Sequence, residues 1–202
     1  LSAPRPRWNL QARAAQFPVL AAMAEGVLIC DGAMGTMLQR ARLSLADFDG
    51  KEGCNEILCR TRPDVLADIH RQAFAAGADI VETNSFGSTP LVLAEYAIAD
   101  QAFDLSRRAA AIAREVADSM TRENPRWPRF VAGSVGPTTK LVSLGHLTYD
   151  ELFDSYVTQI HGLIVGGIDI VQIETAQDLL GVKCGVLAAR RAMQLAGREV
   201  PI

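Results

Sequence analysis

The sequence lacks a strong charge bias and a long apolar run. Its 202 residues carry a formal net charge of −3, which gives no electrostatic argument for a nucleic acid or an anionic membrane as partner. Asp169 and Glu174 interrupt the best apolar candidate, residues 163–173, so no stretch is long enough to span a bilayer. With 49% hydrophobic and 21% charged residues, the composition is typical of a globular protein with a sizeable core.

The sequence also lacks a dense cysteine framework. Its four cysteines are scattered, which predicts free thiols in a reducing compartment, and we take this to be the cytoplasm. Cys54 and Cys59 are separated by four residues, and the nearest histidine is His70. This combination does not favour a metal site at these cysteines.

The chain is expected to have two parts. Residues 1–24 contain three arginines and no acidic residue, and we interpret them as a disordered leader followed by an N-terminal helix. Residues 25–202 are expected to form the folded domain.

Strand and helix signals alternate through this domain. Short apolar runs predict strands at 27–30, 79–83, 130–134 and 168–173, and helical spacing predicts helices at 63–76, 90–118, 148–165 and 176–196. Such apolar strands are buried on both faces, which indicates a parallel sheet covered by helices. Four βα units with right-handed crossovers leave two architectures, a doubly wound sheet or part of a (βα)8 TIM-type barrel. The first strand is followed by DGAMGT rather than G-x-G-x-x-G, which argues against a dinucleotide-binding fold.

In both architectures ligands bind beyond the carboxyl ends of the strands. Three of the four predicted ends carry a carboxylate, contributed by Asp31, Glu82 and Glu174, and none carries a histidine or a lysine cluster. Carboxylates beside glycine-exposed backbone amides suit a zwitterion, so the pattern favours a small amino acid over a phosphate ester. A plainer interpretation also stays open, in which Asp31 and Glu82 only cap the following turns.

Two further aspartates, Asp79 and Asp169, stand at strand beginnings. In this architecture, side chains at that end of the sheet usually contribute to stability rather than to ligand binding. We therefore interpret both as structural.

The four strand ends read DGAMGT, ETNSFGST, GSVGPTT and ETAQD in chain order. Together they closely resemble the homocysteine-binding barrel of the homocysteine S-methyltransferase family, and most of all its cobalamin-dependent members. The resemblance covers about residues 27–202. It implies a (βα)8 barrel of which this chain supplies about the first four units.

The resemblance also implies a binding site for homocysteine. Asp31 and Glu174 would help to bind the amino-acid end of the substrate. The pocket would be lined by Ala33, Met34, Gly35, Thr83 and Asn84. The turn after Cys30 would then hold the amino-acid end of homocysteine close to a carboxylate.

In this family three cysteine thiolates bind Zn²⁺ at the barrel mouth, and the homocysteine sulfur joins as a fourth ligand. The family's G-x-N-C and G-G-C-C motifs are absent here, and none of the four cysteines matches their positions. We therefore assign no metal ligand in this chain and expect the zinc ligands beyond Ile202. The methyl donor implied by the resemblance is methylcobalamin or methyltetrahydrofolate, supplied through other domains of the same polypeptide.

A half barrel would expose unpaired strand edges. We therefore expect this chain to be a fragment that aggregates or pairs with another copy when alone. Two alternatives to an enzyme part stay open: a non-catalytic half barrel that binds an amino acid or self-associates, and an unrelated βα barrel acting on a phosphorylated metabolite.

Overall fold

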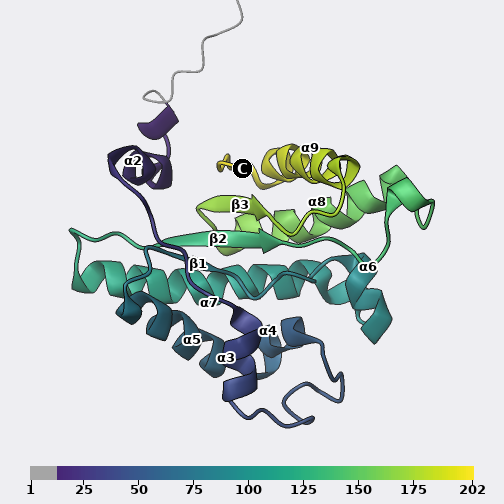
Figure 1. Ribbon diagram of the computed structural model, residues 1–202, viewed down its shortest axis with the longest axis horizontal. Helices are drawn as coiled ribbons and strands as arrows, with labels where there is room; N and C mark the ends of the chain where they lie inside the picture. Colours follow the sequence, from purple (N-terminus) through teal and green to yellow (C-terminus); the bar gives the residue numbers. More distant parts are fainter. Residues whose placement is uncertain (1–12) are drawn as a thin grey trace, which may run out of the picture.

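A parallel sheet whose strands follow chain order forms the centre of the structure (Figure 1). The computed structural model describes residues 13–202. Its strands are β1 (Ile80–Glu82), β2 (Phe130–Val135) and β3 (Ile170–Ile173), in the order β1-β2-β3. Beyond β1, Cys30 forms a single parallel bridge with Ile80, and beyond β3, the Val171 amide donates to the Pro201 carbonyl at 2.9 Å. Because the order never reverses, the sheet matches the barrel architecture and not the doubly wound alternative.

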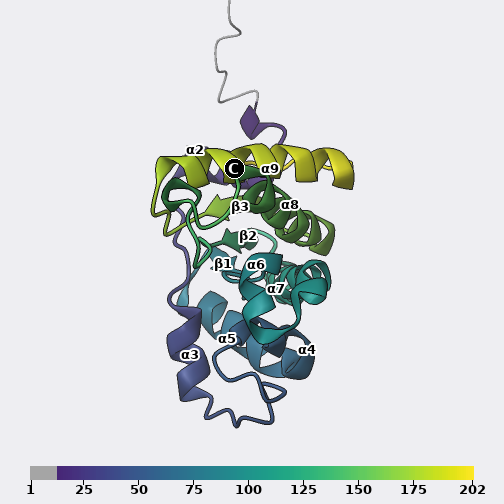
Figure 2. The same ribbon diagram turned by 90° about the vertical axis from the view of Figure 1, so that its right-hand side faces the viewer.

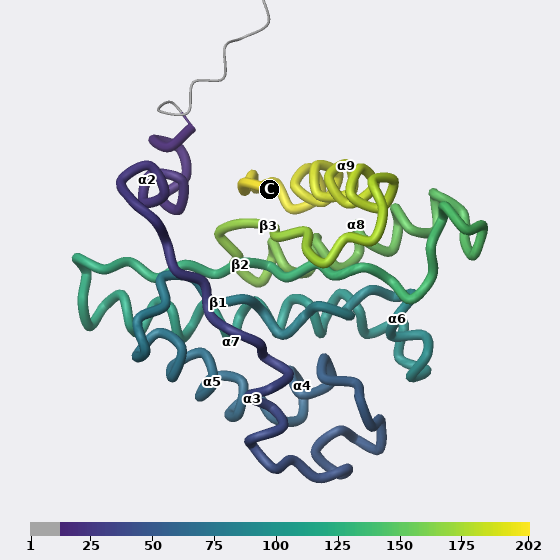
Figure 3. Tube along the Cα trace, viewed as in Figure 1, coloured from purple at the N-terminus to yellow at the C-terminus, as the bar shows by residue number. Residues whose placement is uncertain are grey.

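The helices that follow the strands lie in an arc around one side of the sheet (Figure 2). Figure 3 shows the chain leaving helix α2, passing beside β1 and entering helix α3. The α-helices are α2 (Pro18–Glu25), α3 (Met34–Arg40), α4 (Leu58–Thr61), α5 (Pro63–Ala76), α6 (Pro90–Leu93), α7 (Ala102–Glu123), α8 (Tyr149–Gly166) and α9 (Leu179–Ala196). Single 3₁₀ turns are η1 (Asn55–Ile57), η2 (Ala94–Tyr96), η3 (Ala99–Gln101) and η4 (Val142–Leu144).

Local signals in the sequence set the helix ends. Pro63 occupies the first turn of α5, where its missing N–H costs nothing, and Gly77 ends this helix in the left-handed conformation with φ of 112°. Thr148 and Glu151 form a capping box, in which each side chain bonds to the other's backbone N–H, at the predicted start of the helix. These helix boundaries were predicted and are confirmed.

Alternate residues of each strand face two different layers. One set, which includes Val81, Val131 and Val171, packs in the main core with the helices. The other set, Ile80, Phe130 and Ala132, forms a second core with Phe17 and Val19 at the beginning of α2. The N-terminal helix therefore packs on the face of the sheet that α7 and α8 do not cover.

The predicted structural aspartates tie neighbouring strand beginnings together. Asp79 accepts a hydrogen bond from the Ile29 amide at 2.8 Å, and Asp169 accepts one from the Val131 amide at 2.8 Å. Arg114 of α7 also donates to Asp169, at 2.6 Å. Each carboxylate thus fixes the register of the preceding strand at the end remote from the predicted site.

Replacing Asp169 with alanine is expected to increase amide exchange at the start of β2 by at least tenfold, because a charge-assisted hydrogen bond contributes about 1.5–3 kcal/mol. Hydrogen–deuterium exchange of the peptide containing Val131 measures this. Asp118→Ala is the matched control, since Asp118 pairs with the same Arg114 but is 52% exposed. Equal exchange in the two variants would contradict the assigned role of Asp169.

The first predicted strand differs from expectation. Residues 27–29 are extended but not buried, with Val27 91% and Ile29 60% exposed. Its one neighbour is β1, and no other strand among residues 13–202 covers its second edge. The predicted buried strand is therefore reduced to the single bridge at Cys30. A segment at the edge of a sheet has a hydrogen-bonding neighbour on one side only, so its other side stays uncovered.

Two helical predictions also need correction. The second helical region, 90–118, is divided into α6, two 3₁₀ turns and α7, because Ala97 adopts a left-handed conformation with φ of 57°. Asp178 precedes α9 as its N-cap instead of lying in its first turn, and it accepts a hydrogen bond from the Gly181 amide at 2.6 Å.

Two sequence-based expectations concern the ends and the membrane. The helix expected within residues 1–24 is α2, whereas the predicted disordered leader lies largely outside the described residues. Across residues 13–202, none of the helices combines the length and the apolarity that crossing a membrane requires.

Candidate functional site

The predicted site residues lie at the carboxyl ends of neighbouring parallel strands. Asp31 follows the residue that bridges to β1, and its Oδ1 accepts a hydrogen bond from the Glu82 amide at 2.9 Å. Glu174 follows β3, and its amide donates to the Val135 carbonyl at 3.1 Å. The sheet therefore brings both acidic ends to one edge.

Asp31 is a half-buried carboxyl group beside a second acid. Burial is the main cause that raises its pKa to about 6, the nearby Glu82 carboxylate adds to the increase, and the Glu82 N–H opposes it. Burial and the same two carboxylates raise the pKa of the Cys30 thiol to about 12, with Sγ 3.6 Å from Asp31 and 3.7 Å from Glu82. Negative charge is thus concentrated at this strand end.

Ala33, Met34 and Gly35 lie where the chain enters α3. Ala33 is the N-cap of this helix and provides no side-chain cap, while Met34 and Gly35 form its first turn. A hollow next to them is lined by Asp31, Ala33 and residues of α3 and α5. Asp31 therefore faces the space between these two helices.

Thr83 and Asn84 are buried, and most of their polar atoms already have protein partners. Thr83 Oγ1 lies 2.6 Å from the Ser85 hydroxyl and accepts a hydrogen bond from the Ser134 amide at 3.0 Å. The Asn84 side-chain amide donates to the Asn55 carbonyl at 2.8 Å. Their role at a pocket wall would therefore be exerted through shape and through the remaining Asn84 oxygen.

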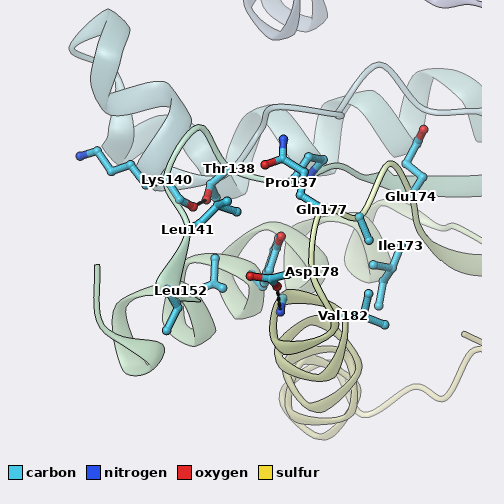
Figure 4. A pocket seen from close by; sticks show the side chains of 14 residues that line it. Pro137, Thr138, Lys140, Leu141, Leu152, Ile173, Glu174, Gln177, Asp178 and Val182 are labelled. Atoms are coloured by element: carbon cyan, nitrogen blue, oxygen red, sulfur yellow. Dashed lines mark hydrogen bonds between the residues drawn. The ribbon is translucent and has the colours of Figure 1, made fainter. Parts of the chain in front are cut away.

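Glu174 lines a second hollow, between the loop after β2 and the helices α8 and α9 (Figure 4). Its Oε1 accepts a hydrogen bond from the Ser134 hydroxyl at 2.5 Å, and its carboxylate points away from Asp178 in Figure 4. The hollow encloses a volume of about 20 Å³, which is room for a single water molecule. This volume is too small for an amino acid, which would have to contact Glu174 outside this hollow.

A polar row on the sheet was missed by reasoning from sequence. Gln172 of β3 donates a hydrogen bond to Glu82 of β1 across the intervening strand β2. The residue of β2 in register with Glu82 is Ala132, whose small side chain leaves room for this contact. The sequence could have predicted this contact. Side chains two residues apart in a strand lie on the same face of the sheet, so Glu82 shares a face with Ile80 and Gln172 shares it with Ile170.

Asp31 and Glu174 share an edge of the sheet but not a hollow among the described residues. Three strand spacings separate their strands, which is about 14 Å along the sheet at ordinary spacing. Neither acid forms an ion pair within residues 13–202, and neither does Glu82 between them. Three carboxyl groups without a basic partner make this edge suited to a cationic group such as an ammonium.

The cysteines do not provide a metal site. Residues 13–202 contain no group of three histidine, cysteine or acidic side chains placed to hold a metal ion. Cys54, Cys59 and Cys184 are free and buried, while Cys30 is exposed, with its thiol proton held by the neighbouring acids. The thiol chemistry of a zinc-thiolate centre therefore does not fit these four positions.

Comparisons with known proteins agree on one family. A family model described as homocysteine S-methyltransferase matches residues 28–202. Methionine synthase from Mycobacterium leprae is 53% identical over 184 residues, and methionine synthase from Mycobacterium tuberculosis is 52% identical over 184 residues. Each alignment covers 91% of this chain, and the chain spans 15% of the length of these relatives.

Solved structures show the same fold. The metallated form of the homocysteine methyltransferase MmuM from Escherichia coli superposes with a TM-score of 0.72 at 23% identity, covering 91% of this chain and 65% of that one. Its oxidized form gives a TM-score of 0.68. With a family match across nearly all described residues, this chain belongs to the homocysteine S-methyltransferase family.

Proposed function

We propose that this chain is the homocysteine-binding part of a methyltransferase that makes methionine from homocysteine. The observation that carries the proposal is the family match over residues 28–202, together with three acids at one edge of the sheet that have no basic partner within residues 13–202. Asp31 and Glu174 would help to bind the amino-acid end of the substrate: Glu174 would contact its ammonium, and Asp31, three strand spacings away, would attract it through negative charge. Ala33, Met34, Gly35, Thr83 and Asn84 would shape the pocket around the rest of the amino acid.

The chemistry of methyl transfer is proposed to depend on groups outside this chain. Zn²⁺ would bind to cysteine thiolates elsewhere in the polypeptide, since the four cysteines here do not fit it. When bound, zinc lowers the pKa of a coordinated thiol, so that the homocysteine sulfur reacts as a nucleophile. Cobalamin and methyltetrahydrofolate would act through further domains, consistent with a chain that spans 15% of the methionine synthase relatives.

The residues of this chain would contribute binding and orientation. A charge-assisted contact from the ammonium to Glu174 would fix one end of homocysteine, and the Ser134 hydroxyl would hold that carboxylate in place. We also propose that the domain begins near residue 25 and that the protein works in the cytoplasm.

Glu174→Ala tests this proposal. In the full-length, zinc-loaded protein, we expect homocysteine affinity to fall at least tenfold, because removing one charge-assisted contact costs about 1.5–3 kcal/mol. Bound zinc should be unchanged by metal analysis. Isothermal titration calorimetry measures the affinity, and Glu115→Ala on the exposed side of α7 is the control. Unchanged affinity in Glu174→Ala would refute the assignment of Glu174.

The alternative is a half barrel that binds an amino acid or self-associates without chemistry of its own. It is favoured by the exposed edge at Val27 and Ile29, which another chain segment would have to cover. One measurement separates the two candidates. Methionine forms from homocysteine and a methyl donor in the full-length protein only if the chain is part of a methyltransferase.

A further inference from the structure

A buried acid lies beneath the loop that carries Thr83 and Asn84. Glu56, in η1, is 9% exposed and has no ion-pair partner within residues 13–202. Burial raises the pKa of its carboxyl group above the ordinary range. Burying such a group is costly unless its hydrogen bonds are made, so the contacts of Glu56 indicate what it does.

The main contact of Glu56 is with the backbone of the loop after β1. Its Oε1 accepts a hydrogen bond from the Gly87 amide at 2.8 Å. A Cβ added at Gly87 would lie 2.9 Å from the same oxygen and 3.2 Å from Val92 Cγ1. The carboxyl group of Glu56 and the loop backbone at Gly87 are therefore in close contact. Any movement of the loop toward η1 would displace the Glu56 side chain.

Two neighbours of Glu56 hold Asn84 itself. The Asn84 side-chain amide donates to the Asn55 carbonyl at 2.8 Å, and the Cys59 thiol donates to the Asn84 carbonyl at 3.4 Å. Together with the bond from Gly87 to Glu56, residues 55–59 contact the loop at both of its ends. They form one side of a clamp on residues 84–87.

The other side of the clamp is β2 and α8. Ser85 donates its hydroxyl to the Ser134 carbonyl at 2.8 Å, and buried Gln159 donates to the Ser85 carbonyl at 2.6 Å. These bonds fix the middle of the loop to the sheet. The orientation of Asn84 relative to the sheet edge is then set by residues 55–59, on the other side of the loop. Among these five residues, Glu56 is the one with a carboxyl group.

We propose that Glu56 is a positioning residue for the homocysteine site, which acts by fixing the loop that carries Thr83 and Asn84. The inference rests on the proposed function, since it assigns these two residues to the pocket wall. Glu56 itself would not touch the substrate. Its loss should weaken substrate binding and leave the transfer step itself largely unchanged.

The test compares Glu56→Ala, Glu56→Gln and Ile57→Ala in the full-length, zinc-loaded protein. We expect Glu56→Ala to raise the homocysteine dissociation constant and KM about tenfold, with kcat changing less than about threefold. Glu56→Gln should restore binding to within about threefold of the original protein, because its amide oxygen can still accept from Gly87. Ile57 is the matched control, since it is fully buried in the next position without a bond to the loop.

Gly87→Ala provides a second approach to the same contact. Its added methyl group should push the loop away from Glu56 and raise KM in the same direction. Combined with Glu56→Ala it should cost less than the sum of the two changes, because both act on one contact. Additive losses would contradict the proposal.

Each further outcome has one meaning. Original affinity in Glu56→Ala, an equal loss in Ile57→Ala, or failure of Glu56→Gln to restore binding would each overturn the positioning role while the proposed function stands. If the original protein bound no homocysteine, the proposed function would fail first, and the inference with it.

Discussion

Replacing Gly162 with alanine is expected to destabilise the domain by about 2 kcal/mol and lower its unfolding temperature by about 5 °C. Gly162 lies in α8 where this helix crosses α7. An added Cβ would lie 2.5 Å from the Phe103 carbonyl oxygen and 2.9 Å from Ser106 Cβ. Since the first of these is backbone, the two helices would have to separate.

The expected loss is the balance of two opposing effects. Alanine is favoured over glycine inside a helix by about 1 kcal/mol, which by itself would stabilise α8. Overpacking a well-packed contact costs about 1–3 kcal/mol, and the cost here lies at the upper end of that range, because a rigid main chain cannot rotate out of the way. A Cβ added at Gly166, one turn further on, would collide with the Arg107 carbonyl in the same manner. Two glycines of α8 therefore allow its close packing against α7.

Calorimetry of the full-length protein measures the change, with Gly35→Ala as control. Gly35 is also helical, but an added Cβ there meets nothing within 4 Å. Its replacement should leave the unfolding temperature equal or slightly raised. A Gly162→Ala protein as stable as the original would show that α7 and α8 can separate at little cost.

The sequence predicted most of the fold because its boundaries are marked by local chemistry. Pro63, Gly77 and the capping box at Thr148 each set a helix end through their own backbone or side-chain preference. The close crossing at Gly162 could not be predicted, because it depends on which residue of α7 lies opposite. The choice between barrel and doubly wound sheet likewise depended on strand order, which no local pattern records.

The candidate site was predicted only in outline. The rule that parallel strands end at one edge predicts Asp31 and Glu174 at the same edge, where the structure has them three strand spacings apart and in different hollows. The sequence did not predict that Thr83 and Asn84 would be tied into a buried network, because their partners Ser134 and Asn55 are distant in the chain. Side-chain roles that arise from contacts between elements need the three-dimensional arrangement.

Homocysteine affinity is expected to fall about tenfold between pH 7 and pH 5 through the protonation of Asp31 alone. The pKa of this group is raised to about 6, so it is largely ionised at the higher pH and largely neutral at the lower. A neutral carboxyl group loses its attraction for the substrate ammonium. Zinc binding by the substrate thiol also weakens in acid, so the original protein should show both effects.

Asp31→Asn separates the two effects. The variant keeps the zinc contribution but has no group at this position that titrates, so its affinity should fall less steeply toward acid than that of the original protein. Calorimetric titrations of both proteins across about pH 5–8 give the difference in slope. Parallel slopes would mean that the charge of the Asp31 carboxylate does not contribute to substrate binding.

Folding stability should respond to the same group with the opposite sign. A carboxyl group whose pKa is raised from 3.8 to about 6 binds more protons in the folded chain than in the unfolded one within that window. Its contribution therefore favours the fold at low pH and is lost as pH rises from about 4 to 6. A purely structural Asp31 would give this stability slope without the binding slope, whereas a substrate-binding Asp31 gives both, and Asp31→Asn should remove both together.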